Sequence, residues 1–252
     1  GGRLFFHRPA DRYTTAMTTC QAEDVIRLAK QLGFALVGIT DALPSPYAQH
    51  VHDWLAAGKH GQMDYLATQV EPRLDPRKLV PGAESIICVA DRYPATPTTT
   101  PADTPPTAPT GRIARYAWGD DYHRVMKKRL HALADTLRER WPEHQYRSAV
   151  DTAPILEREH AQRAGLGWVG KHTILIHPGL GAWMLLGQIV TTLPIQGSPA
   201  PPATNHCGTC TRCIDACPTD CITPYQVDAG RCISYLTLEH RSLIDDSLAQ
   251  AM

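Results

Sequence analysis

The spacing of four cysteines in the last quarter of this chain is the pattern most directly tied to a chemistry. Cys207, Cys210, Cys213 and Cys217 follow the order C-x2-C-x2-C-x3-C, and Pro218 comes directly after the last of them. Bacterial ferredoxins hold iron–sulfur clusters with this spacing. Three thiolates so close in sequence can bind one cubane, while the fourth ligates a different cluster in two-cluster proteins. The pattern therefore predicts an electron-transfer module.

Two other uses of clustered cysteines fit the sequence less well. Structural zinc sites use pairs of thiolates separated by a long spacer, whereas this run places its thiolates at one short pitch. A disulfide framework is typical of short secreted chains, but this chain has 252 residues and no recognisable signal peptide. Iron–sulfur ligation is the favoured interpretation, and zinc is the main alternative.

The remaining cysteines differ in what their surroundings indicate. Cys232 lies on a predicted helix, where a single cysteine is usually a small buried hydrophobe. Because Cys217 faces away from the first cluster and needs partners, we instead predict that Cys232 ligates a second cluster. Cys221 and Cys88 have apolar neighbours and are expected to be structural, and Cys20 receives no role.

The count of candidate ligands is smaller than two clusters require. Two cubanes need about eight thiolates, and the cysteines named so far supply three for the first cluster and two for the second. The chain also stops at Met252 inside a predicted helix. We therefore expect a C-terminally truncated chain whose second cysteine run lies beyond Met252, and poor cluster assembly by the chain itself.

An acidic residue follows one of the predicted strands. Asp151 comes directly after the strand Tyr146–Val150, and Pro154 is expected to begin a helix that continues to Ala164. Strand ends are where α/β folds bind ligands, but an aspartate in this place can equally cap the helix. Both functions stay open for Asp151 from the local pattern. Glu157 and Arg158 are interpreted as a simple pair on the helix surface.

A glycine-rich run follows that helix. Gly165, Gly167 and Gly170 permit positive φ and close approach of the backbone to a ligand. The stretch Lys171-His172-Thr173 adds hydrogen-bond donors. The spacing matches neither of the standard nucleotide-binding fingerprints, so the run indicates a ligand loop without identifying the ligand.

The elements that must position these groups alternate between helices and strands, which predicts an α/β fold for the first domain, residues 17–195. The expected helices cover residues 47–57 and 121–140, together with an apolar face from Val25 to Leu32. The expected strands cover residues 34–39 and 85–90, and residues 173–176 and 182–193 are predicted to pair as a hairpin. The Pro/Thr-rich residues 94–110 are predicted to form an exposed loop.

The two ends of the chain are predicted to be of different kinds. A Pro-rich linker at residues 196–204 opens a second, small domain over residues 196–252, which is held by its metal rather than by a core. Residues 1–16 lack an apolar core and are interpreted as a disordered or non-native leader. Met17 is then a plausible start of the native chain.

Composition excludes several classes of protein. Lys and Arg balance Asp and Glu at 25 each, so the net charge of zero gives no support for a nucleic-acid partner, although a local basic patch remains possible. No apolar run approaches the roughly 18 residues of a membrane span. Eight cysteines, five of them clustered with metal-like spacing, point to a reducing compartment. We expect a cytoplasmic, monomeric protein with no membrane contact.

Taken together, the motifs resemble one family, the epoxyqueuosine reductases. The matching segments cover nearly all of residues 25–240: Met63-Asp64-Tyr65-Leu66, Arg73 to Leu79, Tyr116 to His123, Asp151 to Arg158, Gly165 to Thr173, the cysteine run, and Arg231 to His240. Taken singly the motifs vary in strength, but in this order and spacing they are highly specific. One departure is Ala182, where the family usually shows serine.

The resemblance implies a function. The first domain should bind cobalamin in a fold like that of the nitro/flavin reductases, and the second should be ferredoxin-like with two [4Fe–4S] clusters. The substrate should be epoxyqueuosine at the wobble position of a tRNA anticodon, reduced to queuosine with electrons from a low-potential donor. The family's proton donor matches Asp151.

The resemblance also assigns contacts. Cobalamin contacts match Arg73, Asp151, Lys171, His172 and Thr173. The cluster ligands match Cys207, Cys210 and Cys213 for the first cluster and Cys217 and Cys232 for the second. Trp118, Tyr122 and Trp168 are candidates to wall the corrin or to stack a base, or are ordinary core. Phosphate contacts are expected from the Arg73–Lys78 run and near Arg231 and Arg241.

Two alternatives remain. One is a related cobalamin and iron–sulfur reductase, such as a reductive dehalogenase, which the Asp151 motif and the Arg231–His240 run disfavour. The other is a plain ferredoxin-type electron carrier fused to a structural domain, which would bind no corrin. Binding of cobalamin therefore separates the enzyme from the electron carrier.

Overall fold

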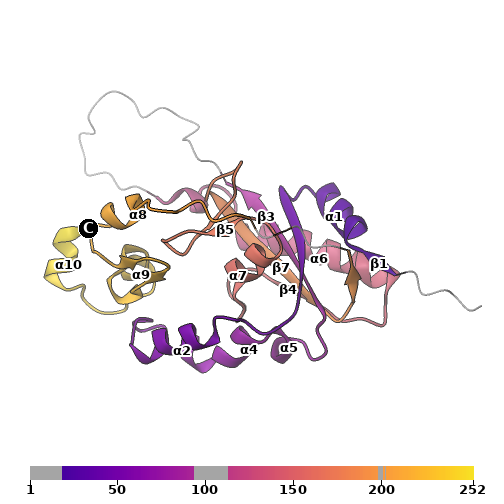
Figure 1. Ribbon diagram of the computed structural model, residues 1–252, viewed down its shortest axis with the longest axis horizontal. Helices are drawn as coiled ribbons and strands as arrows, with labels where there is room; N and C mark the ends of the chain where they lie inside the picture. Colours follow the sequence, from indigo (N-terminus) through magenta and orange to yellow (C-terminus); the bar gives the residue numbers. More distant parts are fainter. Residues whose placement is uncertain (1–18, 94–112, 198–200, 202) are drawn as a thin grey trace, which may run out of the picture.

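A computed structural model describes residues 19–93, 113–197, 201 and 203–252 (Figure 1). The predicted leader at residues 1–16, the Pro/Thr-rich loop at residues 94–110 and part of the predicted linker at residues 196–204 lie outside the described residues. In the part of the chain that is described, no helix is both long enough and apolar enough to cross a membrane.

A four-stranded sheet forms the centre of the fold. Its strands are β2 (Leu36–Asp41), β3 (Ser85–Arg92), β4 (Tyr146–Ala149) and β7 (Met184–Thr191), in the order β2-β3-β7-β4. Every neighbouring pair is antiparallel. The expected mixture of helices and strands is confirmed, and the antiparallel sheet makes the fold α+β rather than a parallel α/β fold, because alternation along the chain does not determine strand direction.

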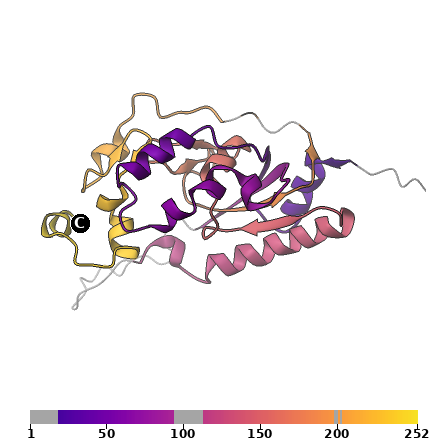
Figure 2. The ribbon, with the colours of Figure 1, turned by 90° about the horizontal axis from the view of Figure 1, so that it is seen from below.

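One face of the sheet is covered by α1 (Ala22–Gln31) and α6 (Tyr122–Arg140). Figure 2 shows the long helix α6 lying along this side. The core between them is apolar and includes Val25, Leu130 and Ile189, all fully buried. Full burial of such a side chain is worth about 1.5–3 kcal/mol. Asp121 caps α6, since its carboxylate accepts the backbone N–H of His123 at 2.9 Å.

The opposite face of the sheet packs against α7 (Glu157–Arg163) and the short ribbon of β5 (Trp168–Val169) and β6 (Leu175–Ile176). Contact between β2 and the end of α7 is very close at Gly38. A Cβ atom on Gly38 would lie 2.1 Å from the carbonyl oxygen of Ala164. Only glycine lets this helix approach the strand so closely.

The sequence placed most elements correctly and two of them wrongly. The strand 182–193 does not pair with 173–176: β7 pairs with β3 and β4, while β6 pairs with β5. The turn at Gly181 is closed by an isolated bridge to His177. Pro154 does not begin a helix, because α7 starts at Glu157 and the residues before it form bends.

The C-terminal cysteine module is small and docks on the second helix of the chain and the residues after it. Its elements are α8 (Arg212–Asp215), β9 (Ile222–Thr223), β10 (Gln226–Val227), η2 (Ala229–Arg231), α9 (Ile233–Leu238) and α10 (Asp246–Ala251). The apolar contact joins Tyr235 and Leu236 to Trp54 of α2 (Ala48–Ala56). In both ribbon views these segments lie side by side (Figures 1 and 2).

Hydrogen bonds reinforce this docking. The indole of Trp54 donates to the carbonyl of Val227 at 2.7 Å, and the hydroxyl of Tyr235 accepts the backbone N–H of Gln62 at 2.9 Å.

The remaining elements are β1 (Cys20–Gln21), paired in parallel with β8 (Ile195–Gln196), and α3 (Tyr65–Thr68), α4 (Val70–Leu74), α5 (Pro76–Leu79) and η1 (Arg115–Ala117).

Candidate active site at Asp151 and the cysteine module

Asp151 is held in an unusual backbone conformation directly after strand β4. Its φ is 55°, in the left-handed region, which costs a non-glycine residue about 1–3 kcal/mol. Aspartate tolerates this region better than most residues. The backbone N–H of Asp151 donates to Glu157 Oε1 at 2.8 Å, so the carboxylate of Glu157 holds the strained residue in place. The side chain of Asp151 is left exposed.

His123 connects the carboxylate of Asp151 to a second carboxylate. Its Nε2 lies 3.2 Å from Asp151 Oδ2, and its Nδ1 lies 2.8 Å from Asp121 Oδ1. Burial alone lowers the pKa of His123, but the hydrogen bonds to Asp151 and Asp121 outweigh it and raise the pKa. The aromatic ring of Tyr122 stacks on the imidazole with the centroids 4.0 Å apart. An imidazole in this position can pass a proton to Asp151.

The structure excludes the helix-cap function for Asp151. The N-cap position of α7 is Leu156, five residues further along, and its side chain makes no capping bond. The interpretation of Glu157 and Arg158 as a surface pair is also wrong. Glu157 accepts from Asp151, while the guanidinium of Arg158 donates to the carbonyl of Thr173 at 2.8 Å.

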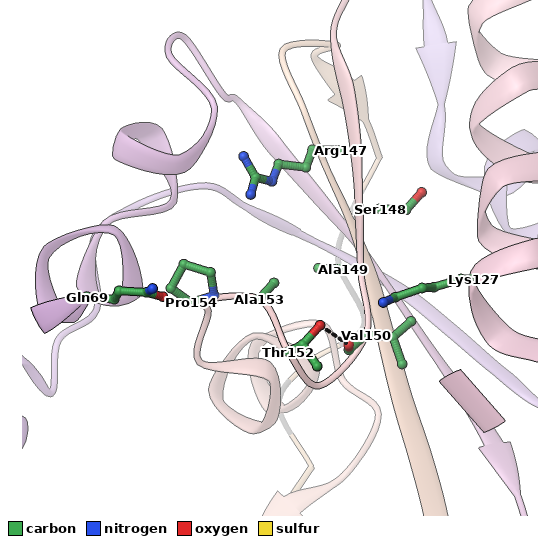
Figure 3. A pocket seen from close by; sticks show the side chains of 9 residues that line it. All are labelled: Gln69, Lys127, Arg147, Ser148, Ala149, Val150, Thr152, Ala153 and Pro154. Carbon is green, nitrogen blue, oxygen red and sulfur yellow. Dashed lines mark hydrogen bonds between the residues drawn. The ribbon is translucent and has the colours of Figure 1, made fainter. Parts of the chain in front are cut away.

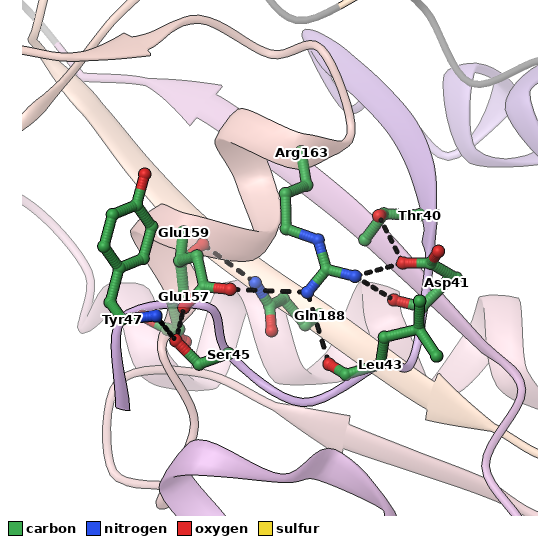
Figure 4. A network of polar contacts seen from close by, with 9 residues as sticks. All are labelled: Thr40, Asp41, Leu43, Ser45, Tyr47, Glu157, Glu159, Arg163 and Gln188. Atoms are coloured by element: carbon green, nitrogen blue, oxygen red, sulfur yellow. Dashed lines mark hydrogen bonds and ion pairs between the residues drawn. The ribbon is translucent and has the colours of Figure 1, made fainter. Parts of the chain in front are cut away.

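Helix α7, which carries Glu157, is anchored by a network of polar contacts (Figure 4). Buried Glu159 accepts from the hydroxyl of Ser45 at 2.5 Å and from Arg163 at 3.3 Å. Arg163 also pairs with Asp41 at the end of β2. The amide of Gln188 in β7 donates to the carbonyl of Glu157 at 2.9 Å. These contacts fix the start of α7 against the sheet. The carboxylate of Glu157, which holds Asp151, is therefore itself held rigidly.

A cavity of about 160 Å³ opens beside Asp151. One part of its lining is polar and contains Tyr122, Asp151, Glu157 and Arg158; the other part is apolar and contains Ile174, Leu175, Met184, Leu185 and Leu186. Burial raises the pKa of Tyr122, and the charge of Asp151 adds to this effect. The phenol therefore stays protonated at neutral pH. A ligand bound here would meet an apolar wall and a carboxyl group together.

The residues expected to contact cobalamin lie in different surroundings. Arg73 is half-buried in α4, and its Nε is buried with no hydrogen-bond partner among the described residues. Electrostatically it faces Tyr65 and Glu157. His172 Nδ1 accepts the backbone N–H of Ile174 at 3.0 Å. The unpaired guanidinium nitrogen makes Arg73 the member of this set best prepared for a polar ligand.

Lys171 and Thr173 already form hydrogen bonds within the protein. The ammonium of Lys171 donates to the carbonyls of Gly208 and Cys210 at 2.8 and 2.9 Å, which ties the cysteine loop to the glycine-rich run. Thr173 has a φ of 67°, and its carbonyl and hydroxyl oxygens accept hydrogen bonds from the guanidinium of Arg158. The glycine-rich run thus joins the cavity at Asp151 to the cysteine module.

The first three cysteines of the module lie on one short loop. Cys210 donates its backbone N–H to the carbonyl of Cys207 at 2.8 Å, and Cys213 follows at the start of α8. Cys210 is exposed, and Cys207 and Cys213 are half-buried. Their thiols are free. The donor set contains only sulfur, which suits iron–sulfur ligation better than magnesium or calcium binding.

The other cysteines of the module form a separate group. Cys217 Sγ lies 3.4 Å from Cys221 Sγ. Cys232 occupies the N-cap position of α9 without a side-chain capping bond and packs at the docking contact. Cys221 is buried, as its apolar neighbours in the sequence indicated. Within the described ranges, no three His, Cys, Asp or Glu side chains are already arranged around a metal position.

The three aromatic candidates, Trp118, Tyr122 and Trp168, lie in three different surroundings. Trp168 is 8 % exposed and belongs to the core, so the core interpretation holds for it. Tyr122 lines the cavity beside Asp151. Trp118 is 38 % exposed and lies at the surface, with its indole donating to the carbonyl of Ile113 at 3.0 Å.

Two residues of the site were missed by the sequence reasoning. His123 was noted only as the end of the Tyr116–His123 motif, and Glu157 only as a surface residue. Their partners are 28 and 6 positions away in sequence. The available signal was the Asp121-Tyr122-His123 triplet, which places a titratable ring at the start of a helix.

Replacing Glu157 by glutamine should change how stability depends on pH. Burial raises the pKa of Glu157 from its ordinary value near 4.5 to about 7. The folded state binds this proton more tightly than the unfolded chain, so wild-type stability falls as pH rises from about 4.5 to about 7. Glu157→Gln stays neutral, and its free energy of unfolding should therefore increase relative to wild type across this window.

Denaturant unfolding at several pH values between 4 and 8, the range in which Glu157 titrates, measures this difference. Glu139→Gln, which removes an exposed carboxylate from α6, is the matched control. If the difference in unfolding free energy between Glu157→Gln and wild type stays constant over this range, Glu157 does not titrate with a raised pKa in the folded protein.

Two families match this chain along its sequence. Residues 73–152 match the family described as "Epoxyqueuosine reductase QueG, DUF1730". Residues 206–252 match the family described as "4Fe-4S double cluster binding domain". The first match ends one residue after Asp151, and the second covers all of the cysteine module from His206 onward.

Individual relatives extend the similarity over most of the chain. An epoxyqueuosine reductase of Xanthomonas campestris is 43% identical over 231 residues, 91% of this chain and 64% of that protein. One of Leadbetterella byssophila is 40% identical over 233 residues, 92% of this chain and 74% of that protein. The chain thus spans about two thirds of the length of these relatives.

Solved structures agree with the sequence matches. The crystal structure of an epoxyqueuosine reductase with an epoxyqueuosine-modified tRNA-Tyr stem loop superposes with a TM-score of 0.77 at 31% identity, over 89% of this chain and 59% of that chain. The enzyme from Streptococcus thermophilus gives a TM-score of 0.79 at 28% identity, over 89% and 60%. The predicted family is confirmed: the chain belongs to the epoxyqueuosine reductases.

Proposed function

We propose that this chain carries the reducing part of an enzyme that converts epoxyqueuosine in a tRNA anticodon to queuosine. The observation that carries the proposal is the exposed carboxyl group of Asp151, held at the mouth of a cavity by Glu157 and His123. The relatives named as epoxyqueuosine reductases support it, and one of them was solved with an epoxyqueuosine-modified stem loop.

The proposed cofactors are cobalamin and two [4Fe–4S] clusters. Cys207, Cys210 and Cys213 would hold the first cluster, and Cys217 and Cys232 would contribute to the second. The all-sulfur donor set and the match of residues 206–252 to a double-cluster domain support this. When bound, the clusters and cobalamin supply the electrons and the reducing centre.

The cavity at Asp151 supports the proposed corrin site. Ile174, 46 % exposed, and Leu186 offer an open apolar wall. We propose that Arg73, with its unpaired Nε, and the loop residues His172 and Thr173 contact the corrin. Lys171 would act differently from the other members of this set, because its ammonium already joins the cysteine loop to the site.

The residues of the chain would supply the proton. Reduction of the epoxide to an alkene consumes two electrons and two protons, breaks both bonds to the epoxide oxygen and releases that oxygen as water. Asp151 would donate a proton to the oxygen as the first carbon–oxygen bond breaks. His123 would return a proton to Asp151 across their 3.2 Å contact.

The finer features of the fold and the cellular setting belong to the same proposal. We propose a nitro/flavin-reductase-like domain at residues 17–195 and a ferredoxin-like domain at residues 196–252. The free thiols of the chain suit a reducing cytoplasm. A low-potential donor would deliver electrons to a monomeric enzyme.

Titration with cobalamin under anaerobic conditions tests the proposal. The visible spectrum of the corrin should change as it binds. The reduced protein, once it carries both clusters, should convert an epoxyqueuosine stem loop to the queuosine form, as read by mass spectrometry of the nucleosides. An unchanged corrin spectrum would indicate the plain electron carrier instead. Turnover of an organohalide without turnover of the stem loop would indicate the dehalogenase-type alternative.

A further inference from the structure

Two basic side chains lie at the free edge of the sheet, one helical turn from the site. Lys127 belongs to α6, and Arg147 belongs to the edge strand β4. Neither forms an ion pair with any residue in the described part of the chain. We call these two residues the β4-edge surface. Their charges are available to an external partner.

A pocket of about 430 Å³ follows this edge. Figure 3 shows Arg147 and Gln69 on one side of the strand and Lys127 reaching in from the other. Ser148 and Thr152 add hydroxyl groups to the lining, which contains no carboxylate. The edge of a sheet also leaves backbone N–H groups without partners. Positive charge, neutral donors and the lack of acids favour an anion as the occupant.

The basic residues that the sequence suggested for RNA contact are mostly occupied. Arg77 pairs with Asp75 at 2.9 Å, and Lys78 pairs with Glu71. Arg231 donates to a backbone carbonyl at 3.0 Å. Breaking such contacts would reduce the gain from binding a phosphate, whereas the two cations of the β4-edge surface have no such ion pair to break.

The β4-edge surface is continuous with the proposed catalytic loop. Val150 and Thr152, which flank Asp151, both line the pocket. Lys127 follows His123 by four positions on α6, and residues four apart lie on the same face of a helix. His123 contacts Asp151 directly. A polyanion on this surface would therefore pass within reach of the Asp151 loop.

We propose that the β4-edge surface binds the phosphodiester backbone of the RNA substrate while the modified base enters the cavity at Asp151. This rests on the proposed function and names the contact that would hold the substrate. Lys127 and Arg147 lie on opposite sides of the strand, so they would contact different phosphates of the chain. An acidic protein partner is the competing occupant. RNA is favoured because the surface adjoins the loop on which the base is processed.

Binding of an anticodon stem–loop RNA to Lys127→Gln/Arg147→Gln tests the inference. Affinity of the wild-type chain should fall as KCl rises, because phosphate contacts release counterions. Each lost phosphate contact lowers the slope of log K against log salt by about 1, so the double variant should lower it by about 2. Arg138→Gln/Arg140→Gln is the matched control, with the same charge change at roughly 17–20 Å along α6.

The outcomes separate this inference from the proposed function. A reduced slope in the test variant with an unchanged slope in the control supports the β4-edge surface. Equal slopes for the test variant and wild type overturn it, while cobalamin binding and epoxide reduction remain to support the function. Unchanged RNA binding with weakened binding to poly-glutamate would assign the surface to an acidic protein and also overturn the inference. Circular dichroism of each variant verifies folding.

Discussion

Replacing Asp151 by asparagine is expected to lower turnover of an epoxyqueuosine stem loop by about 10²–10⁴-fold, the contribution typical of a general acid. The amide has nearly the same shape as the carboxyl group but cannot deliver a proton at neutral pH. The backbone contact to Glu157 at 2.8 Å does not involve the replaced group. The loop should therefore keep its conformation, and cobalamin should bind with an unchanged visible spectrum.

Single-turnover assays with the reduced, cofactor-loaded protein measure this effect directly. Asp120→Asn, which alters an exposed carboxylate in the loop before α6, serves as the control and should retain full activity. Activity of Asp151→Asn within about threefold of wild type would show that the proton comes from another group, since general acids contribute at least about 100-fold. Loss of cobalamin binding would instead assign Asp151 to the ligand pocket.

Replacing Gly38 by alanine is expected to destabilise the fold by about 3 kcal/mol, at the upper end of the cost of overpacking. The added Cβ would lie 2.1 Å from the carbonyl oxygen of Ala164 and 2.5 Å from a methyl group of Leu166. The leucine side chain can rotate, but the carbonyl belongs to the end of α7 and cannot move alone. Relief of the clash requires α7 to shift away from β2.

Chemical denaturation monitored by circular dichroism gives the free energy of unfolding. Gly179→Ala is the control, because a Cβ there meets only His177 at 3.5 Å, an ordinary contact. The shift of α7 should also disturb Glu157, so the Glu157-dependent pH effect should weaken in Gly38→Ala. A destabilisation below about 0.5 kcal/mol, the scale of ordinary surface substitutions, would show that the helix is not held closely against the strand.

Local chemistry in the sequence was sufficient for several features. The cysteine spacing predicted the iron–sulfur module, and residues 206–252 match a double-cluster domain. The helix expected at residues 121–140 is observed at Tyr122–Arg140, with Asp121 as its cap. The strand expected at residues 85–90 lies within β3, Ser85–Arg92. Each of these depends on residues within a few positions of one another, whose periodicity and capping act along the chain.

Strand partners and the surroundings of Asp151 were decided by the tertiary structure. The residues after the Gly181 turn were expected to pair locally, but β7 pairs with β3 and β4 because both of its faces are needed to close the two halves of the core. An apolar strand matches more than one neighbour, and only burial on both faces selects among them.

The role of Asp151 could not be decided by its own segment. A strand end followed by a helix is compatible with a cap or with a catalytic acid. The N-cap position of α7 is Leu156, which excludes the cap, and the contact with His123, the φ of 55° and the bond to Glu157 are what support the proposed acid. In the same way, Lys171 contacts the cysteine loop across 37 positions. Sequence determined which groups this protein carries; folding determined which of them meet, because side chains far apart in sequence are brought together only when the core is packed.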